Sequence, residues 1–188
     1  MSSNLSRRIA ATVSALVAVP LAAVLSAGLS AGPAYAESAG FRDPADAAGS
    51  PTDIRHVRID HTQRALRLRV AFTDLRRTGS SGMSVFVDTD RARRGPERVL
   101  SAGLFDGTDY LMFRTRGWQV RGEPLSCSYR LWLDYADDVA RVRMARGCLT
   151  RAGRVRVALR MTDDNGNDGT ITDWLGERRQ FTRWLAAG

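Results

Sequence analysis

The sequence of 188 residues contains no lysine, only two histidines and only two cysteines. Because lysine is absent, all 28 basic residues are arginine, which points to a high-GC coding bias rather than to selection for anion binding. Neither His56 nor His61 lies in a metal-ligand or nucleophile motif, and Gly-x-Ser-x-Gly and His-Glu-x-x-His are both missing. We therefore expect a protein that is not an enzyme and has no catalytic residue. A glycosidase-like pair of carboxylates stays open, since separation in space is invisible in a sequence.

Beyond residue 36 the sequence also lacks an apolar run long enough to span a bilayer. The one long apolar run, at residues 9–29, follows Arg7-Arg8 and precedes Ala34-Tyr35-Ala36, which fits the small-x-small cleavage rule. This order predicts a secretory signal peptide at residues 1–36 and a secreted protein with no membrane span after cleavage near Ala36. Export by the twin-arginine route and an uncleaved anchor are the alternatives.

Removing the signal peptide leaves a chain of single-domain length. Two cysteines in an exported chain are expected to form a disulfide bond rather than to stay free. The net charge of +8 suits acidic partners such as teichoic acid, acidic glycans or nucleic acid. A surplus of charge more often marks a solvated face, so we expect no specific binding of nucleic acid.

The two cysteines bound a segment with the pattern of a β-hairpin. A tight turn centred on Asp137-Asp138 places Cys127 directly opposite Cys148. The same register gives one nearly apolar face, which pairs Tyr129, Leu131, Leu133 and Tyr135 with Arg146, Met144, Val142 and Ala140. We therefore predict an antiparallel hairpin that is closed by a Cys127–Cys148 disulfide.

The rest of the chain also alternates with the period of strands. Residues 37–53 have almost no apolar periodicity and are predicted to be an extended lead-in. Residues 54–60 and 65–73 form the first predicted strand pair, with Ile59 opposite Leu66 and Val57 opposite Leu68. Further short strands follow at regular spacing, without a long amphipathic helix, so residues 54–188 are predicted to form a single antiparallel β-sandwich of the all-β class. For residues 181–185, a strand and a helical turn are equally compatible with the sequence.

Alternation also predicts which side chains are buried. The side chains expected inside the sandwich are Leu66, Leu68, Val70, Phe72, Leu131, Leu133, Val155, Val157 and Leu159. The side chains expected outside are Arg67, Arg69, Arg143 and Arg156.

Two parts of the sequence resemble known groups of proteins. The first part resembles family 9 carbohydrate-binding-module and DOMON-like sandwiches through Asp53-Ile54, Val57, Ile59, Leu66, Leu68, Val70, Phe72, Asp74-Leu75 and Val85-Phe86-Val87-Asp88-Thr89-Asp90. The run from Tyr129 to Tyr135, with Cys148-Leu149, is similar to a group of uncharacterised secreted proteins from high-GC Gram-positive bacteria. The first resemblance implies a β-sandwich that binds sugars between aromatic side chains and holds a structural calcium ion. The second implies no particular activity.

A calcium site is the clearest metal hypothesis. Residues 163–173 gather oxygen donors in a glycine-rich segment, as calcium requires, and the predicted ligands are Asp163, Asp164, Asn165, Asn167, Asp168 and Asp173. The EF-hand pattern is broken in either frame, and an ordinary Asx/Gly turn is the alternative. Asp88, Asp90 and Glu97, joined by Asp43 or Asp46, form a second set of oxygen donors. Arginines in the same loop favour ion pairs there instead.

The candidate ligand-binding residues are Trp132 and Arg130. Both lie on the face of the predicted hairpin opposite the disulfide, which should meet water in a two-layer sandwich. Trp132 would then be an exposed platform, unless arginine side chains or the C-terminal tail cover it.

These observations predict a secreted, non-enzymatic binding domain for an extracellular glycan or cell-wall polymer. The alternative is an extracellular protein-interaction or structural domain. It would use an arginine-rich sheet face made of Arg67, Arg69, Arg141, Arg143, Arg154 and Arg156.

Overall fold

The computed structural model describes residues 36–164 and 169–188, so the predicted signal peptide lies outside the described residues except for Ala36. In chain order the elements are β1 (Glu37–Arg42), β2 (Ile54–His61), β3 (Ala65–Phe72), β4 (Gly82–Asp88), β5 (Arg98–Gly103), β6 (Tyr110–Arg116), β7 (Gln119–Arg121), β8 (Tyr129–Asp134), β9 (Val139–Ala145), the 3₁₀ helix η1 (Arg146–Leu149), β10 (Arg154–Asp164), β11 (Thr170–Trp174) and β12 (Leu185–Ala186). No helix in the described part of the chain is long and apolar enough to cross a membrane.

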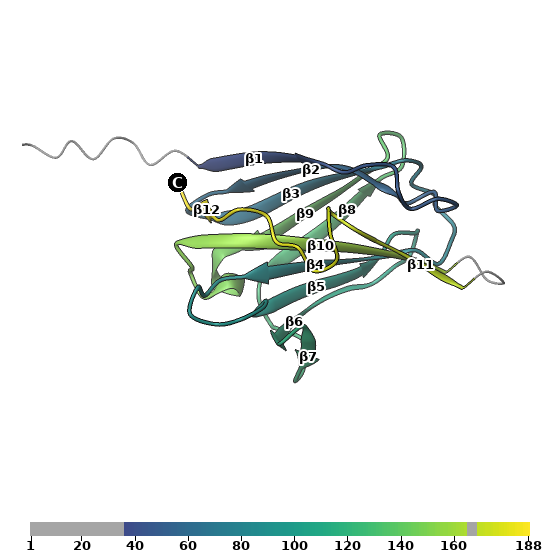
Figure 1. Cartoon of the computed structure of the whole chain (residues 1–188). Helices are drawn as coiled ribbons and strands as arrows, with labels where there is room; N and C mark the ends of the chain where they lie inside the picture. Colours follow the sequence, from purple (N-terminus) through teal and green to yellow (C-terminus); the bar gives the residue numbers. More distant parts are fainter. Residues whose placement is uncertain (1–35, 165–168) are drawn as a thin grey trace, which may run out of the picture. The chain divides into compact units, whose positions relative to one another are not determined.

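The strands form two antiparallel sheets. The five-stranded sheet has the order β1-β2-β3-β9-β8. The seven-stranded sheet has the order β11-β10-β4-β5-β6-β7, and β12 adds to it by pairing with β10. The two sheets lie one above the other (Figure 1). The predicted antiparallel, all-β sandwich is therefore confirmed.

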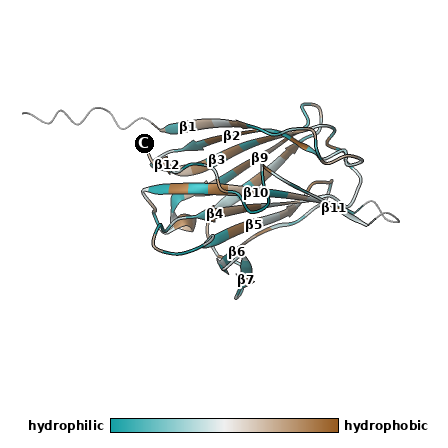
Figure 2. Ribbon diagram, viewed as in Figure 1, coloured by the Kyte–Doolittle hydropathy of each residue, from teal (hydrophilic) through white to brown (hydrophobic). Residues whose placement is uncertain are grey.

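The core lies between the sheets and follows the predicted alternation. Apolar and polar residues alternate along the strands (Figure 2), as expected for strands with one buried face. Most side chains predicted to be inside are buried: Leu66, Leu68, Val70, Phe72, Val155, Val157 and Leu159. Leu131 and Leu133 are only half-buried, because β8 is the edge strand of its sheet.

The β8–β9 hairpin forms, but in a register that differs from the prediction. Leu131 pairs with Val142 rather than with Met144, because the turn is centred one residue earlier than expected. The side chain of Asp134 accepts a hydrogen bond from the amide of Asp137 (3.3 Å), and Asp138 adopts a positive φ of 55°. Moving the centre of a turn by one residue changes the pairing by two, which leaves every side chain on its predicted face.

The predicted disulfide is present between Cys127 and Cys148, whose Cα atoms are 5.6 Å apart. Cys127 precedes β8, whereas Cys148 lies in η1, just after β9. The turn of η1 brings Cys148 back towards the start of β8, where Ser128 accepts a hydrogen bond from the amide of Ala145 (2.8 Å). The disulfide therefore joins the open end of the hairpin, although the register that predicted it was wrong.

The β2–β3 hairpin shows the same kind of difference. Ile59 pairs with Leu68 and Val57 with Val70, two positions away from the predicted partners. The hydroxyl of Thr62 accepts hydrogen bonds from the amides of Arg64 (3.2 Å) and Ala65 (3.0 Å) and so places the turn one residue later. The buried face is again the predicted one.

Both ends of the described chain belong to the sheets. Residues 37–42 of the predicted lead-in form β1, which pairs along its whole length with β2. The sequence signal was weak because only Ala39 and Phe41 of β1 pack against the core. At the other end, Leu185 is fully buried and pairs with Val155, so a short strand is found at the tail.

Candidate functional site

The predicted calcium ligands do not form one site among the described residues. Asn165, Asn167 and Asp168 lie outside the described residues. Asp163 is buried in β10 and accepts hydrogen bonds from the hydroxyls of Ser50 (2.7 Å) and Ser81 (2.8 Å). Asp164 is exposed at the end of the same strand. Asp173 lies on β11, and its carboxylate lies near the segment that follows β1.

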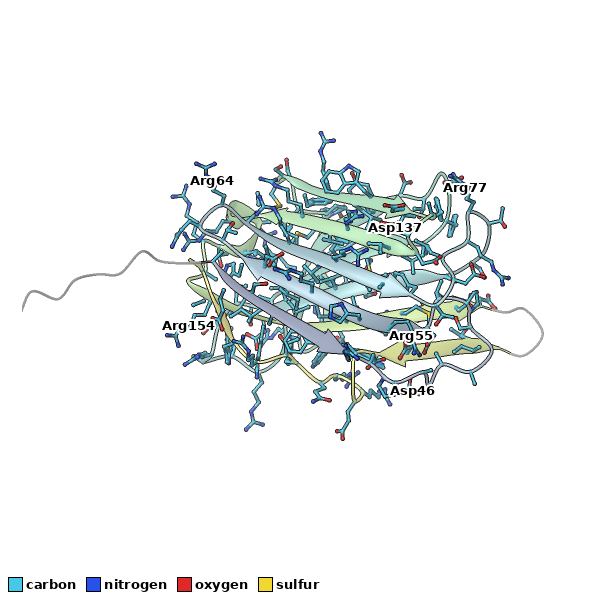
Figure 3. All side chains as sticks on the ribbon, turned by 90° about the horizontal axis from the view of Figure 1, so that it is seen from above. Asp46, Arg55, Arg64, Arg77, Asp137 and Arg154 are labelled. Atoms are coloured by element: carbon cyan, nitrogen blue, oxygen red, sulfur yellow. A yellow bond between two sulfur atoms is a disulfide. The ribbon has the colours of Figure 1, made fainter. Side chains whose placement is uncertain are left out.

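Asp173 belongs to an acidic cluster whose members come from the first and the last parts of the domain's sequence. The cluster consists of Asp43, Asp46 and Asp173, each of which offers a carboxylate oxygen within 4.8 Å of the others. Asp43 and Asp46 follow β1, whereas Asp173 lies on β11. The sequence had placed these residues in two separate metal hypotheses, and their meeting was not predicted. Figure 3 shows Asp46 at the same end of the domain as Arg55.

One oxygen of each buried carboxylate in the acidic cluster is held by a backbone amide. Asp43 Oδ1 accepts a hydrogen bond from the amide of Gly176 (2.6 Å), and Asp173 Oδ2 accepts one from the amide of Ile54 (2.8 Å). Asp43 is 6% exposed, and its second oxygen, Oδ2, is buried without a hydrogen-bond partner among the described residues. Leaving a buried oxygen without a partner is costly, so a positive group at this atom would stabilise the folded state.

The electrostatics of the acidic cluster are those of crowded carboxylates. Burial raises the pKa of Asp173 to about 7 and that of Asp43 to about 6. These values already include repulsion from the neighbouring carboxylates, which acts in the same direction as burial, and the backbone hydrogen bonds, which only partly oppose it. A bound cation would relieve this repulsion.

The second set of oxygen donors predicted from sequence is occupied by protein partners. Asp88 is fully buried and forms an ion pair with Arg156. Asp90 pairs with the exposed Arg93, and Glu97 accepts hydrogen bonds from the amide (2.7 Å) and hydroxyl (3.1 Å) of Thr89. The alternative interpretation, ion pairs with arginines of the same loop, therefore holds for Asp90 alone, since Asp88 pairs with an arginine of β10 and Glu97 with Thr89.

The outer face of the five-stranded sheet carries two cross-strand rows of arginine. The first row aligns Arg58, Arg69 and Arg141 and ends at Trp132 on the edge strand. The second row aligns Asp60, Arg67, Arg143 and Arg130. We call these six arginines and Trp132 the arginine face; it is the sheet surface that faces the viewer in Figure 3.

An open groove of about 950 Å³ runs over the arginine face. Trp132 lines the groove and is 47% exposed, so arginine side chains and the C-terminal tail do not bury it. Arg130 is exposed in the neighbouring row but does not line the groove. At the β8 end the groove reaches Tyr135, whose ring is covered by the guanidinium of Arg77 at 4.7 Å.

The arginines of this face differ in how far their charge is compensated. Arg141 pairs with Asp134 (3.1 Å) and Asp137 (3.4 Å), and the hydrogen bond from Arg141 lowers the pKa of Asp134. Arg58 and Arg69 also have carboxylate partners. Within residues 36–164 and 169–188, Arg67, Arg130 and Arg143 form no ion pair. The second row therefore holds a local excess of positive charge.

The arginine-rich surface predicted from sequence is divided between the two sheets. Arg67, Arg69, Arg141 and Arg143 lie together on the arginine face, whereas Arg154 and Arg156 belong to β10 of the other sheet. Arg156, predicted to be outside, is half-buried because it pairs with Asp88 and packs against the rings of Phe181 and Trp184. Alternation showed that these arginines avoid the core, but it carried no information about which sheet each strand joins.

No protein-family model matches the chain, and no curated protein matches it either.

Proposed function

We propose that the protein is a secreted, non-enzymatic binding domain whose ligand is an anionic extracellular glycan or cell-wall polymer, and that the ligand binds to the arginine face. The observation that carries this proposal is the exposed Trp132, which ends the first arginine row and lines one open groove together with five arginines of the two rows. A sugar ring can pack on an exposed indole, while guanidinium groups form paired hydrogen bonds with carboxylate or phosphate.

The dimensions of the arginine face favour a polymer over a small molecule. Neighbouring strands are about 4.8 Å apart, so the bases of the side chains in one row repeat at about that spacing across the sheet. An extended chain with a negative charge on successive units can therefore meet several arginines at once. Each contact is weak in water, but several contacts in series give useful affinity.

The proposal predicts that Arg67→Ala together with Arg143→Ala weakens binding to an anionic polymer by at least tenfold. Both side chains lack an ion-pair partner among the described residues, so their removal takes charge from the ligand site without breaking a structural contact. A hydrogen bond to a charged group contributes about 1.5–3 kcal/mol, and about 1.4 kcal/mol corresponds to a factor of ten. Isothermal titration calorimetry with teichoic acid and with an acidic glycan measures the effect.

A charge-matched control separates the arginine face from general electrostatic attraction. Arg94→Ala together with Arg114→Ala removes the same charge from exposed positions outside this sheet, and should leave the affinity nearly unchanged. Trp132→Ala should also weaken binding. A higher salt concentration should weaken binding of the wild type, because salt screens the attraction between the arginines and the anionic ligand. Equal losses in both double variants would contradict the proposal. Binding of a protein partner in place of any polymer would support the alternative, a protein-interaction domain.

We propose further that the acidic cluster holds a structural calcium ion. Asp43, Asp46 and Asp173 supply carboxylate oxygens of the kind that calcium binds, and water or backbone carbonyls can complete six to eight ligands. Asp43 Oδ2, which is buried without a hydrogen-bond partner among the described residues, is the observation that favours this site over the segment predicted from sequence. An ion here would join the segment after β1 to β11.

Millimolar calcium is therefore expected to raise the melting temperature of chelator-treated protein by several degrees. An ion that binds only the folded state stabilises it by about 2.7 kcal/mol at one hundred times its dissociation constant. Asp46→Asn should abolish the rise, because it removes one of the three carboxylate charges that hold the ion. Asp46 is the exposed member of the cluster, so its replacement leaves the buried carboxylates in place. Asp109→Asn changes an exposed carboxylate elsewhere and should retain the rise. If the calcium-dependent rise in melting temperature were lost in Asp168→Ala but kept in Asp46→Asn, the ion would be assigned to the predicted segment at residues 163–173 instead.

A further inference from the structure

A separate pocket of about 480 Å³ lies on the seven-stranded sheet, away from the arginine face. Its walls come from four elements that are distant in sequence: Phe86 on β4, Trp118 in the β6–β7 turn, Arg160 on β10 and Trp174 on β11. Arg178 and Arg179, from the segment after β11, complete it. We call this the aromatic pocket. Its volume is within the usual range for small-ligand sites.

The aromatic rings of the pocket form one packed group. The ring centroid of Phe86 is 5.0 Å from that of Trp118 and 5.9 Å from that of Trp174. The two indoles contact each other edge to face at 5.8 Å. Phe86 is buried, whereas Trp118 and Trp174 are only partly covered. The pocket therefore has a firm apolar wall that still has ring surface free for a ligand.

Arg160 supplies a positive charge that has no carboxylate partner among the described residues. It is aligned with Trp174 on one side and with Ser84 on the other, and its Nη2 donates a hydrogen bond to the hydroxyl of Ser84 (3.2 Å). Its Nε is buried and has no hydrogen-bond partner among the described residues. Burial lowers the pKa of Arg160, and the nearby charge of Arg179 lowers it further.

The charge of the aromatic pocket is entirely of one sign. Arg160, Arg178 and Arg179 all line it, and no carboxylate of the described chain does. Aromatic faces compensate part of this charge: the guanidinium carbon of Arg160 is 5.9 Å from the ring centroid of Trp174, and that of Arg179 is 5.6 Å from the ring centroid of Trp118. Cation–π contacts satisfy no N–H donor, so Arg160 Nε still lacks an acceptor.

Two residues of the pocket adopt a backbone conformation that ordinary side chains avoid. Trp118 has a φ of 73° and Arg179 a φ of 62°. Gly117 and Trp118 are the central pair of the β6–β7 turn, where the second position usually holds glycine. Such residues cost about 1 kcal/mol or more each and are found preferentially at ligand sites.

We propose that the aromatic pocket binds a small ring-containing anion, such as a sugar unit that carries a carboxylate, sulfate or phosphate. The anionic group pairs with the guanidinium groups of Arg160 and Arg179, and the apolar face of the ring packs on Trp174. The ring and the charge are both required, because the aromatic wall and the guanidinium groups contribute separately. This site is independent of the polymer site proposed above, since it uses the other sheet.

Tryptophan fluorescence of the full chain tests the proposal, with glucuronate, glucose 6-sulfate and glucose 6-phosphate as probes. At least one probe should change the emission at a concentration tenfold below that required for glucose or for inorganic sulfate and phosphate. The three probes distinguish the anionic groups. The proposal would be overturned if glucose bound with the same affinity as the charged sugars, or if no probe changed the emission at 10 mM.

Variants locate the response. Arg160→Gln should weaken binding of the preferred probe at least tenfold, while Arg67→Ala with Arg143→Ala should leave it unchanged. The latter result separates this site from the polymer site. Arg114→Ala, an exposed arginine on the same sheet, is the matched control. If Arg160→Gln does not fold, Arg179→Ala, at an exposed position, decides: wild-type affinity in that variant would overturn the assignment.

Discussion

Replacing Cys127 and Cys148 together by alanine is expected to lower the free energy of unfolding by about 3 kcal/mol. The disulfide closes a loop of sequence separation 21, and the loss of this constraint increases the conformational freedom of the unfolded chain. Cys148 is also buried, so its replacement removes a small packing contribution. A single domain has only about 5–15 kcal/mol of stability, which makes this a large fraction.

Denaturant unfolding of the double variant and of the wild type measures this difference. Ser126→Ala, at an exposed position beside Cys127, is a control that should change stability by less than about 0.5 kcal/mol. A reducing agent should destabilise the wild type by a similar amount and leave the double variant unchanged. A loss below about 1 kcal/mol in the double variant would show that the hairpin holds its geometry without the disulfide.

Asp88→Ala is expected to cost about 3 kcal/mol, because it removes one partner of a buried ion pair. Asp88 is fully buried, and its Oδ2 accepts a hydrogen bond from Nε of Arg156 (2.8 Å) and forms an ion pair with Nη2 (2.7 Å). The guanidinium lies against the rings of Phe181 and Trp184, so water can only partly replace the lost carboxylate. Asp88 Oδ1 also accepts a hydrogen bond from the amide of Asp90 (3.1 Å), which is lost as well.

Asp90→Ala is the matched control on the same loop. Its ion pair with Arg93 is exposed, and exposed pairs contribute only about 0–1 kcal/mol. A double variant, Asp88→Leu with Arg156→Met, should recover much of the stability lost in Asp88→Ala, since removing both partners leaves no buried charge unpaired. Equal costs for Asp88→Ala and Asp90→Ala would mean that the buried pair contributes no more than the exposed one.

The two hairpins show how far a sequence pattern can reach. The faces of β3 and β9 were predicted correctly, yet both hairpin registers were wrong by two residues. A shift of two preserves the alternation of side chains, so the apolar pattern cannot distinguish the two registers. The choice is made by hydrogen bonds inside the turns, which the hydroxyl of Thr62 and the carboxylate of Asp134 accept from backbone amides.

The candidate sites were less predictable than the fold. From its place opposite the disulfide, Trp132 was a candidate for an exposed platform, with cover by arginine side chains or the C-terminal tail as the alternative, and the structure shows it 47% exposed. The acidic cluster was missed because Asp43 and Asp173 are far apart in sequence and meet only when β1 and β11 lie at the same end of the domain. Arg160 and Trp118 were missed because neither stands in a motif, and only strand order brings them to one pocket.

The sequence alone determined the all-β class, the buried faces of most strands and the pairing of the only two cysteines. The class and the buried faces depend on alternation with a period of two, which is a local pattern. The pairing of the cysteines depends only on their number. The tertiary structure decided the registers, the entry of residues 37–42 into a sheet and the partners of Asp43, Asp88 and Arg160. The physical reason is that turn geometry and strand order set these contacts, which join residues far apart in the chain and leave no periodic trace in the sequence.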